Sequence, residues 1–210
     1  YVGLAETFVS QEKYPLAEQT LVRAIELQPK NWATLMAMGR YLFHVGRVDE
    51  SISYFQRIDE LLPESRVASN NLGAAYYLKG RFAEAAAAWE EALGGSTNTN
   101  VYLNLGSSYF FLGRFDDAAQ MYQQALELAP EHFEVWGNLG DAYRYSKKQA
   151  ELADAAYHRA IELAESHLQI NPADAVAIAA LAHYQAAIGD RDQALENIGL
   201  AAELAQKDMF

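Results

Sequence analysis

The tripeptide Asn-Leu-Gly occurs three times in the chain, as Asn71-Leu72-Gly73, Asn104-Leu105-Gly106 and Asn138-Leu139-Gly140. Three residues after each glycine stands a tyrosine, namely Tyr76, Tyr109 and Tyr143. The copies lie about 34 residues apart, and self-similarity at such a period is the signature of a stacked repeat architecture. The sequence therefore predicts a solenoid, which offers a binding surface along its length.

The rest of the unit recurs at the same spacing. Within the two central units the recurring small and aromatic residues are Gly80, Phe82, Ala85, Trp89, Ala92, Gly113, Phe115, Ala118, Tyr122, Ala125 and Pro130. Upstream and downstream the pattern continues through Gly39, Leu42, Gly46, Ser51, Phe55, Ile58, Pro63, Ala182, Gly189, Ala194, Ile198 and Ala201. The repeat therefore extends over essentially the whole chain.

This spacing of small and aromatic residues resembles that of the tetratricopeptide repeat. The resemblance implies an all-α fold, a right-handed α-α superhelical solenoid of about six repeats, each a pair of helices. We expect one solenoid over residues 1–210, with units at approximately 1–31, 32–65, 66–98, 99–132, 133–174 and 175–210. Since the chain lacks an initiator Met and a polar capping helix, we expect it to be a fragment of a longer protein.

Glycines and small residues predict how each pair is built. Gly46, Gly80, Gly113 and Gly189 fall where the first helix must end in a left-handed residue, a conformation that glycine adopts without a clash. We expect the helices of a pair to approach most closely at small residues such as Gly73 and Ala85, with the aromatic residues Tyr76 and Trp89 filling the gaps beside them.

One repeat is irregular. Between Ala160 and Pro172 the chain has about seven residues more than the other units, close to two helical turns. We therefore expect a long second helix in this unit. Such an extended helix is similar to tetratricopeptide segments of bacterial signalling proteins with kinase, cyclase or winged-helix domains.

Composition excludes several classes of partner. The net charge is −12 and the pI is about 4.8, whereas binding to a phosphate backbone needs a basic surface, so we expect no nucleic acid partner. No apolar run approaches the roughly 20 residues of a membrane span. The chain has no cysteine, which excludes disulfides and leaves the compartment open. A cytoplasmic location is favoured, and the periplasm stays open as the alternative.

The sequence offers little support for catalysis. The five histidines are scattered, none in an HExxH spacing, and there is no glycine-rich phosphate loop. His158 and Glu162 share a helix face, as metal ligands do, but solvated side chains have the same spacing. We therefore expect no enzyme activity, no metal and no cofactor.

The candidate binding surface is the concave face, which in tetratricopeptide arrays is lined by the first helix of every pair. Residues one helical turn from the three asparagines share that face and complete a groove with a polar floor and aromatic walls. The candidate peptide-binding residues are Asn71, Asn104, Asn138, Arg40, His44, Tyr77, Ser107, Phe110, Phe111, Asp141, Arg144 and Tyr145.

The three asparagines carry the sharpest chemical signal. A carboxamide has a donor and an acceptor, which match the N–H and C=O of a peptide unit whatever its side chain. Successive inner helices lie roughly 10 Å apart and an extended peptide advances about 3.3 Å per residue, so one asparagine meets every third residue. The pattern resembles the asparagine ladder of O-linked N-acetylglucosamine transferase. Ala37 and Ala180 interrupt it, which limits a bound segment to about nine residues.

Alternatives remain open at this point. The asparagines could instead satisfy local backbone groups or face water, and Arg40, Arg144 and His44 either contact an acidic or phosphorylated partner or are simply solvated. Three functions follow. The first is a peptide-binding module, and the second is a regulatory segment of a larger signalling enzyme or transcription regulator. The third is a scaffold that forms homo-oligomers through its uncapped apolar ends, Tyr1-Val2 and Met209-Phe210.

Overall fold

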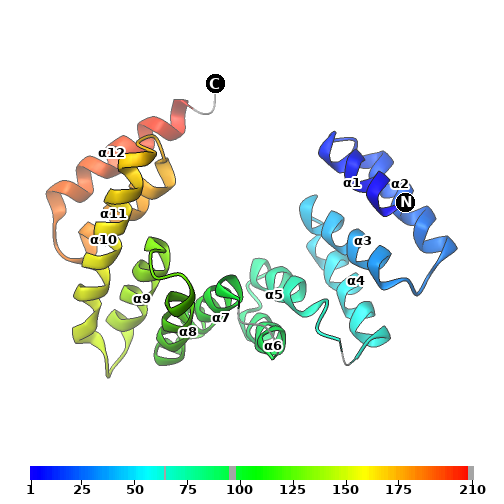
Figure 1. Cartoon of the computed structure of the whole chain (residues 1–210), viewed down its shortest axis with the longest axis horizontal. Coiled ribbons are helices and arrows are strands. Elements are labelled where there is room, and N and C mark those ends of the chain that lie inside the picture. Colours follow the sequence, from blue (N-terminus) through cyan, green and yellow to red (C-terminus); the bar gives the residue numbers. More distant parts are fainter. Residues whose placement is uncertain (64, 95–97, 208–210) are drawn as a thin grey trace. The chain divides into compact units, whose positions relative to one another are not determined.

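The computed structural model describes residues 1–63, 65–94 and 98–207, and within these residues every regular element is a helix. An all-α fold of consecutive helix pairs is thereby confirmed (Figure 1). The helices are α1 (Val2–Ser10), α2 (Tyr14–Leu27), α3 (Trp32–His44), α4 (Val48–Leu61), α5 (Ser69–Leu78), α6 (Phe82–Leu93), α7 (Thr99–Phe111), α8 (Phe115–Leu128), α9 (Phe133–Tyr145), the 3₁₀-helix η1 (Ala150–Leu152), α10 (Ala153–Ile170), α11 (Ala175–Ala187) and α12 (Arg191–Lys207).

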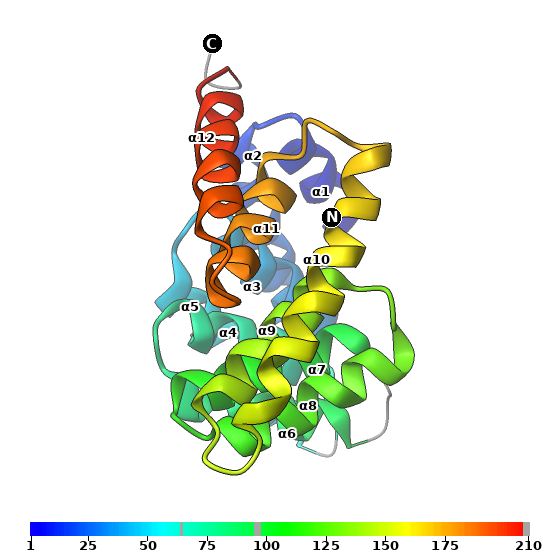
Figure 2. The same cartoon turned by 90° about the vertical axis from the view of Figure 1, so that its left-hand side faces the viewer.

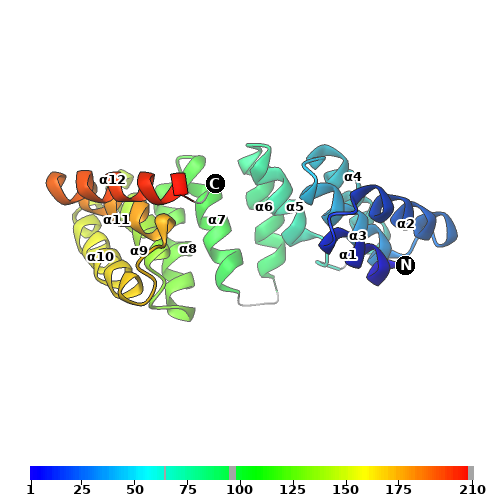
Figure 3. The same cartoon turned by 90° about the horizontal axis from the view of Figure 1, so that it is seen from above.

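The chain divides into two compact units, Tyr1–Thr97 and Asn98–Phe210. Three helix pairs make up the first unit, α1/α2, α3/α4 and α5/α6, and three make up the second, α7/α8, α9/α10 and α11/α12. Within a unit, each pair packs on the next, and the two helices of a pair lie side by side, as Figure 3 shows for α5 and α6. Each expected repeat thus contains one helix pair.

The turn glycines adopt the conformation that the sequence predicts. Gly46, Gly80, Gly113 and Gly189 have φ values of 81°, 70°, 72° and 89°. At these turns the next backbone N–H reaches back to the first helix; Arg114 N, for example, donates to the carbonyl of Tyr109 at 2.8 Å. This is the bond that closes a left-handed helix end. The first pair makes the same turn with Glu12, whose φ is 56°.

In four pairs, α3/α4, α5/α6, α7/α8 and α9/α10, an aromatic ring of the second helix lies on a glycine of the first. A Cβ atom added to Gly39, Gly73, Gly106 or Gly140 would lie 2.4, 2.5, 2.7 or 2.7 Å from the rings of Phe55, Trp89, Tyr122 and Tyr157 respectively. All four rings are at most 2% exposed. The ring of the second helix therefore occupies the space that a side chain of the first would need, so that Trp89 lies directly on Gly73.

Helix α10 is the long helix that the sequence predicts. It continues ten residues beyond Ala160, to Ile170, whereas α8 continues three residues beyond the equivalent Ala125, to Leu128. The difference is the seven extra residues, and Figure 2 shows the resulting helix lying against α9 and α11. The turn before it is also different, because Ser146 Oγ accepts from the backbone N–H groups of Lys148 and Gln149, both at 3.1 Å.

Across the described residues, every helix is too short or too polar to span a bilayer.

We predict that Gly106→Ala lowers the free energy of unfolding by about 1–3 kcal/mol, because the new methyl group overlaps the ring of Tyr122. Chemical denaturation followed by circular dichroism measures the change. Gly199→Ala in α12 is the matched control, since a Cβ atom there meets nothing within 4 Å. It should stabilise by up to about 1 kcal/mol, the usual gain of alanine over glycine in a helix. Equal effects of the two substitutions would contradict the ring-on-glycine account.

Candidate functional site

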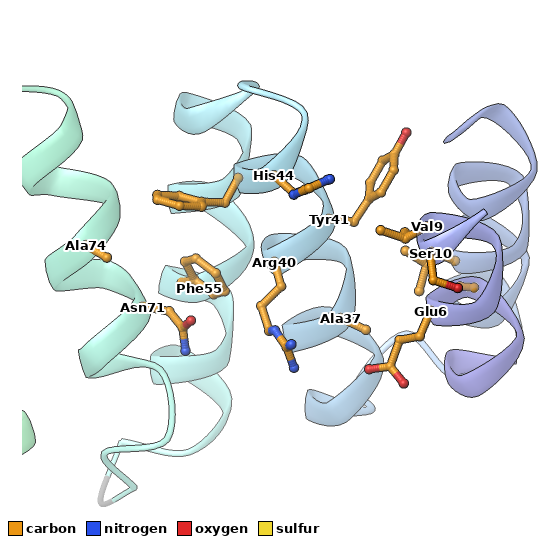
Figure 4. Close-up of a pocket in the computed structure, with 13 residues that line it drawn as sticks. Glu6, Val9, Ser10, Ala37, Arg40, Tyr41, His44, Phe55, Asn71 and Ala74 are labelled. Atoms are coloured by element: carbon orange, nitrogen blue, oxygen red, sulfur yellow. The ribbon is translucent and has the colours of Figure 1, made fainter. Parts of the chain in front are cut away.

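The first unit has a hollow of about 520 Å³ on the side formed by its first helices, α1, α3 and α5. Figure 4 shows Ala37 and Arg40 of α3 facing it between Glu6 of α1 and Asn71 of α5. The full lining consists of Ala5, Glu6, Val9, Ser10, Leu21, Ala37, Arg40, Tyr41, Phe43, His44, Phe55, Asn71 and Ala74. The structure thus brings three of the predicted site residues, Arg40, His44 and Asn71, into one concavity.

The polar groups of the hollow are held by regular structure and have few internal partners. Helix α3 is capped at its start by Asn31, whose Oδ1 accepts a hydrogen bond from the backbone N–H of Thr34 at 3.2 Å. Arg40 and His44 lie four residues apart in this helix, which is about one turn. Among the described residues, the Asn71 amide makes one weak contact, from Nδ2 to Met36 Sδ at 3.5 Å. Among the described residues Arg40 forms no ion pair.

Tyr77 lies elsewhere. Its ring packs inside its own helix pair, with ring centroids 5.4 Å from Phe82 and 5.8 Å from Trp89. Burial raises the pKa of its phenol above the ordinary value. Tyr77 therefore belongs to the packing of α5 against α6 and is not among the residues that line the hollow.

In the second unit, Asn104 of α7 and Asn138 of α9 are half-buried. Neither side chain has a hydrogen-bond partner among the described residues, whereas other asparagines are engaged: Asn70 Oδ1 accepts from Trp89 Nε1 at 3.1 Å, and Asn197 donates to Gln185 at 2.8 Å. Each of the two carboxamides therefore keeps a free donor and a free acceptor.

The predicted residues beside these asparagines are already occupied. The hydroxyl of Ser107 donates to the carbonyl of Leu103 at 2.9 Å and accepts from Tyr122 at 3.2 Å. Phe110 packs edge-on against Phe111 and Phe115, with ring centroids 6.0 and 5.3 Å away. Tyr145 stacks on Phe115 at 5.3 Å. Within this aromatic cluster, Phe111 and Tyr145 are 56% and 58% exposed.

Asp141 and Arg144 connect α9 to α10 and α11. Asp141 accepts a hydrogen bond from the hydroxyl of Tyr157 at 2.7 Å, and His183 Nε2 of α11 lies 3.1 Å from its Oδ1. Arg144 donates to the carbonyl of Ala187 and lies 5.0 Å above the ring of Tyr157. Because their charged groups are used inside the unit, these two residues position α11 rather than present free charges.

Comparison with known proteins assigns the family. A model described as tetratricopeptide repeat matches residues 64–131, and a second with the same description matches residues 2–66 and 103–175. The chain belongs to the tetratricopeptide repeat family. This fold is a protein–protein interaction scaffold, so the partners of the chain are proteins or peptides.

Solved structures show the same tetratricopeptide solenoid fold. A MamA fragment from Desulfovibrio magneticus RS-1 is 19% identical, with a TM-score of 0.72 over 78% of this chain and 93% of that one. YrrB, a tetratricopeptide protein with an unusual peptide-binding site, is 21% identical, with a TM-score of 0.63 over 90% and 94%. The Cut9–Hcn1 structure of the APC/C is 17% identical, with a TM-score of 0.75 over 98% and 39%. No curated protein matches the sequence.

Sequence reasoning missed the contribution of α1 to the hollow. The tetratricopeptide spacing places Ala5 in the position of Gly39, so Glu6 and Ser10 occupy the positions of Arg40 and His44. This assignment follows when the first unit is aligned through Ala5. It was missed because alanine stands here in place of the glycine of the central units. His183 was also missed, although it stands one residue after Ala182 as Asp141 stands after Gly140.

Two further sequence predictions concern the pair His158 and Glu162 and the apolar ends of the chain. Glu162 pairs with Arg159 at 2.6 Å, and within the described ranges no three His, Asp or Glu residues are grouped as they would be to hold a metal ion. Of the apolar ends, Tyr1 is 65% exposed, whereas Met209 and Phe210 lie outside the described residues.

The contact between His183 and Asp141 predicts a pH-dependent stability. The hydrogen bond to Asp141 raises the pKa of His183 above its ordinary value, against the opposing effects of burial and of Arg144. A raised histidine pKa stabilises the fold fully below the unfolded pKa of about 6.5, and this stability is lost as pH rises through the folded pKa. His183→Gln should therefore lower the thermal midpoint more at about pH 6 than at about pH 8.5.

Thermal unfolding of the wild type and the variant at both pH values measures this difference. His158→Gln, which changes an exposed histidine of α10, is the matched control and should show no such pH dependence. A destabilisation by His183→Gln that is the same at both pH values would rule out the charged contact with Asp141.

Proposed function

We propose that this tetratricopeptide chain binds an extended peptide or protein segment along the inner faces of its first helices, and that it grips the main chain of that segment. One observation carries the proposal. Asn104 and Asn138 are half-exposed and have no hydrogen-bond partner among the described residues, although neighbouring polar groups such as Ser107 and Asp141 are fully engaged.

The helix geometry supports an inward direction for these side chains. Asn104 and Asn138 stand two residues before Gly106 and Gly140, and two residues turn an α-helix through about 200°. Because each glycine faces the ring of its own second helix, each asparagine faces away from its own pair. In the first unit the equivalent Asn71 lines the hollow, as this argument requires.

The chemistry favours recognition of a peptide backbone. Each carboxamide can donate to a peptide carbonyl and accept from a peptide N–H. Helices α7 and α9 pack within one unit, and an inner-helix spacing of roughly 10 Å corresponds to about three residues of an extended chain. The exposed rings of Phe111 and Tyr145 supply apolar surface for side chains of the bound segment. YrrB, a protein of the same fold with a peptide-binding site, supports the proposal by analogy.

We predict that Asn104→Ala combined with Asn138→Ala weakens peptide binding by about 1–3 kcal/mol, or about 5- to 150-fold in Kd. The loss corresponds to two to four hydrogen bonds of ordinary strength. Peptides enriched from a phage-displayed random library on the wild-type protein serve as probes. Synthetic labelled copies are then titrated against both proteins by fluorescence anisotropy.

Asn171→Ala is the control, because Asn171 is exposed between α10 and α11 of the same unit and its side chain has no hydrogen bond among the described residues. This variant should bind as the wild type does. A peptide N-methylated at the contacted amides should bind the wild type weakly, and its Kd should not change with the Asn104/Asn138 substitutions. If the Asn104/Asn138 variant keeps full affinity for every enriched peptide, the carboxamides play no part in binding.

A further inference from the structure

We propose that the hollow between α1, α3 and α5 selects the sequence of the bound segment. It takes one bulky apolar residue flanked by an acidic residue, which pairs with Arg40, and a basic residue, which pairs with Glu6. This inference rests on the proposed function, because it names the peptide chemistry that the first helices of the first unit recognise. It adds a side-chain preference to binding through the main chain.

The hollow is built to hold an apolar group. Its volume of about 520 Å³ lies within the range of about 300–1,000 Å³ that is usual for ligand sites. Its walls are mainly aliphatic and aromatic, with Val9 from α1, Phe43 from α3 and Phe55 from α4. Ala37 of α3 and Ala74 of α5 line it with short side chains (Figure 4). A large side chain of a peptide therefore finds apolar contacts on several sides.

Arg40 supplies a positive charge that the protein itself does not use. Most arginines of the chain are engaged by a carboxylate or a carbonyl, including Arg57, which donates to the carbonyl of Pro29 at 2.7 Å. Those paired with carboxylates are Arg23, Arg47, Arg81, Arg114 and Arg159. Arg40 has no such partner among the described residues, although the chain carries a net charge of −12. A free guanidinium at the edge of an apolar hollow favours an anionic group on the ligand.

Glu6 supplies the opposite charge. It is exposed on α1, and it forms no ion pair among the described residues, with Arg40 included. The hollow thus presents one unpaired positive and one unpaired negative group at different places on its edge, as Figure 4 shows. A peptide with one charge of each sign beside its apolar residue neutralises both Arg40 and Glu6. The hollow therefore selects which charged residues the peptide carries, and not only the net charge of the peptide.

A carboxylate fits Arg40 better than a phosphate does. A single guanidinium matches one carboxylate through two parallel hydrogen bonds. A phosphorylated residue carries nearly two negative charges and is usually held by several cations, whereas this hollow adds only the imidazole of His44 and the negative charge of Glu6. The anionic residue of the bound segment is therefore Asp or Glu.

The test is a selection of phage-displayed random peptides on the wild-type protein and on Arg40→Glu, with the enriched sequences compared. The wild type should enrich peptides that combine a bulky apolar residue with one acidic and one basic neighbour. Arg40→Glu should replace the acidic residue by Lys or Arg in the enriched set. A synthetic wild-type peptide should bind Arg40→Glu about 5-fold or more weakly, since attraction in an exposed pair becomes repulsion. Changing its acidic residue to Lys should restore binding.

Two further variants keep the test specific. Arg191→Glu makes the same charge change at an exposed arginine of α12 that has no ion pair among the described residues, and it should leave the enriched sequences unchanged. Ala37→Leu fills the hollow and should remove the preference for a bulky apolar residue while leaving Arg40 in place. Circular dichroism verifies that each variant is folded.

The outcomes separate this inference from the proposed function. If wild-type peptides lose affinity in the Asn104/Asn138 variant but show no charge or apolar preference that Arg40→Glu or Ala37→Leu alters, main-chain binding stands and the selective hollow is refuted. If the preferences change as expected but the asparagine substitutions have no effect, the hollow is supported and the carboxamide mechanism is refuted. If no peptide is enriched on the wild type, both are refuted.

Discussion

The contact on which the four helix pairs from α3/α4 to α9/α10 depend is that of an aromatic ring lying on a glycine. Without a Cβ atom, Gly106 lets the ring of Tyr122 lie in the space that any other residue would fill, and Gly39, Gly73 and Gly140 do the same for their partners. This contact fixes the rotation of the first helix about its own axis. It therefore also decides which residues of that helix face away from the pair, and these are the residues available to a ligand.

Polar residues on that free face are divided between two tasks. Asp141 and Arg144 hold α11 through His183 and the carbonyl of Ala187, so the charge that they carry maintains the packing of the last pair. Asn104 and Asn138 make no comparable bond among the described residues. A half-exposed carboxamide without an internal partner costs less free energy of folding than an unpaired buried charge does. The fold is therefore stable without a bond to these two side chains.

The periodicity of the sequence predicts the helix pairs, the left-handed glycine turns and the extension of α10, because each depends on local backbone rules or on residue counts. The directions of individual side chains are less predictable. Tyr77 and Ser107 share the predicted face, yet Tyr77 turns its ring toward Phe82 and Ser107 bonds to Tyr122. A residue at the edge of a helix face can reach either side, and the neighbouring helix decides between them. The sequence also hides Glu6, since Ala5 replaces the glycine that marks the other units.

One position of the repeat illustrates how this fold gains different kinds of recognition. Two residues before the packed glycine, α7 and α9 carry asparagine, whose carboxamide is the group proposed to bind a peptide main chain. At the same position α3 carries Ala37, whose methyl group opens space for a side chain of the ligand instead. The ring on the glycine is the same in each of these pairs, so either choice leaves the core intact. In the proposed mode of binding, exchange of asparagine and alanine at this position changes what a tetratricopeptide unit binds without changing how it folds, because packing and the proposed recognition occupy opposite sides of one helix.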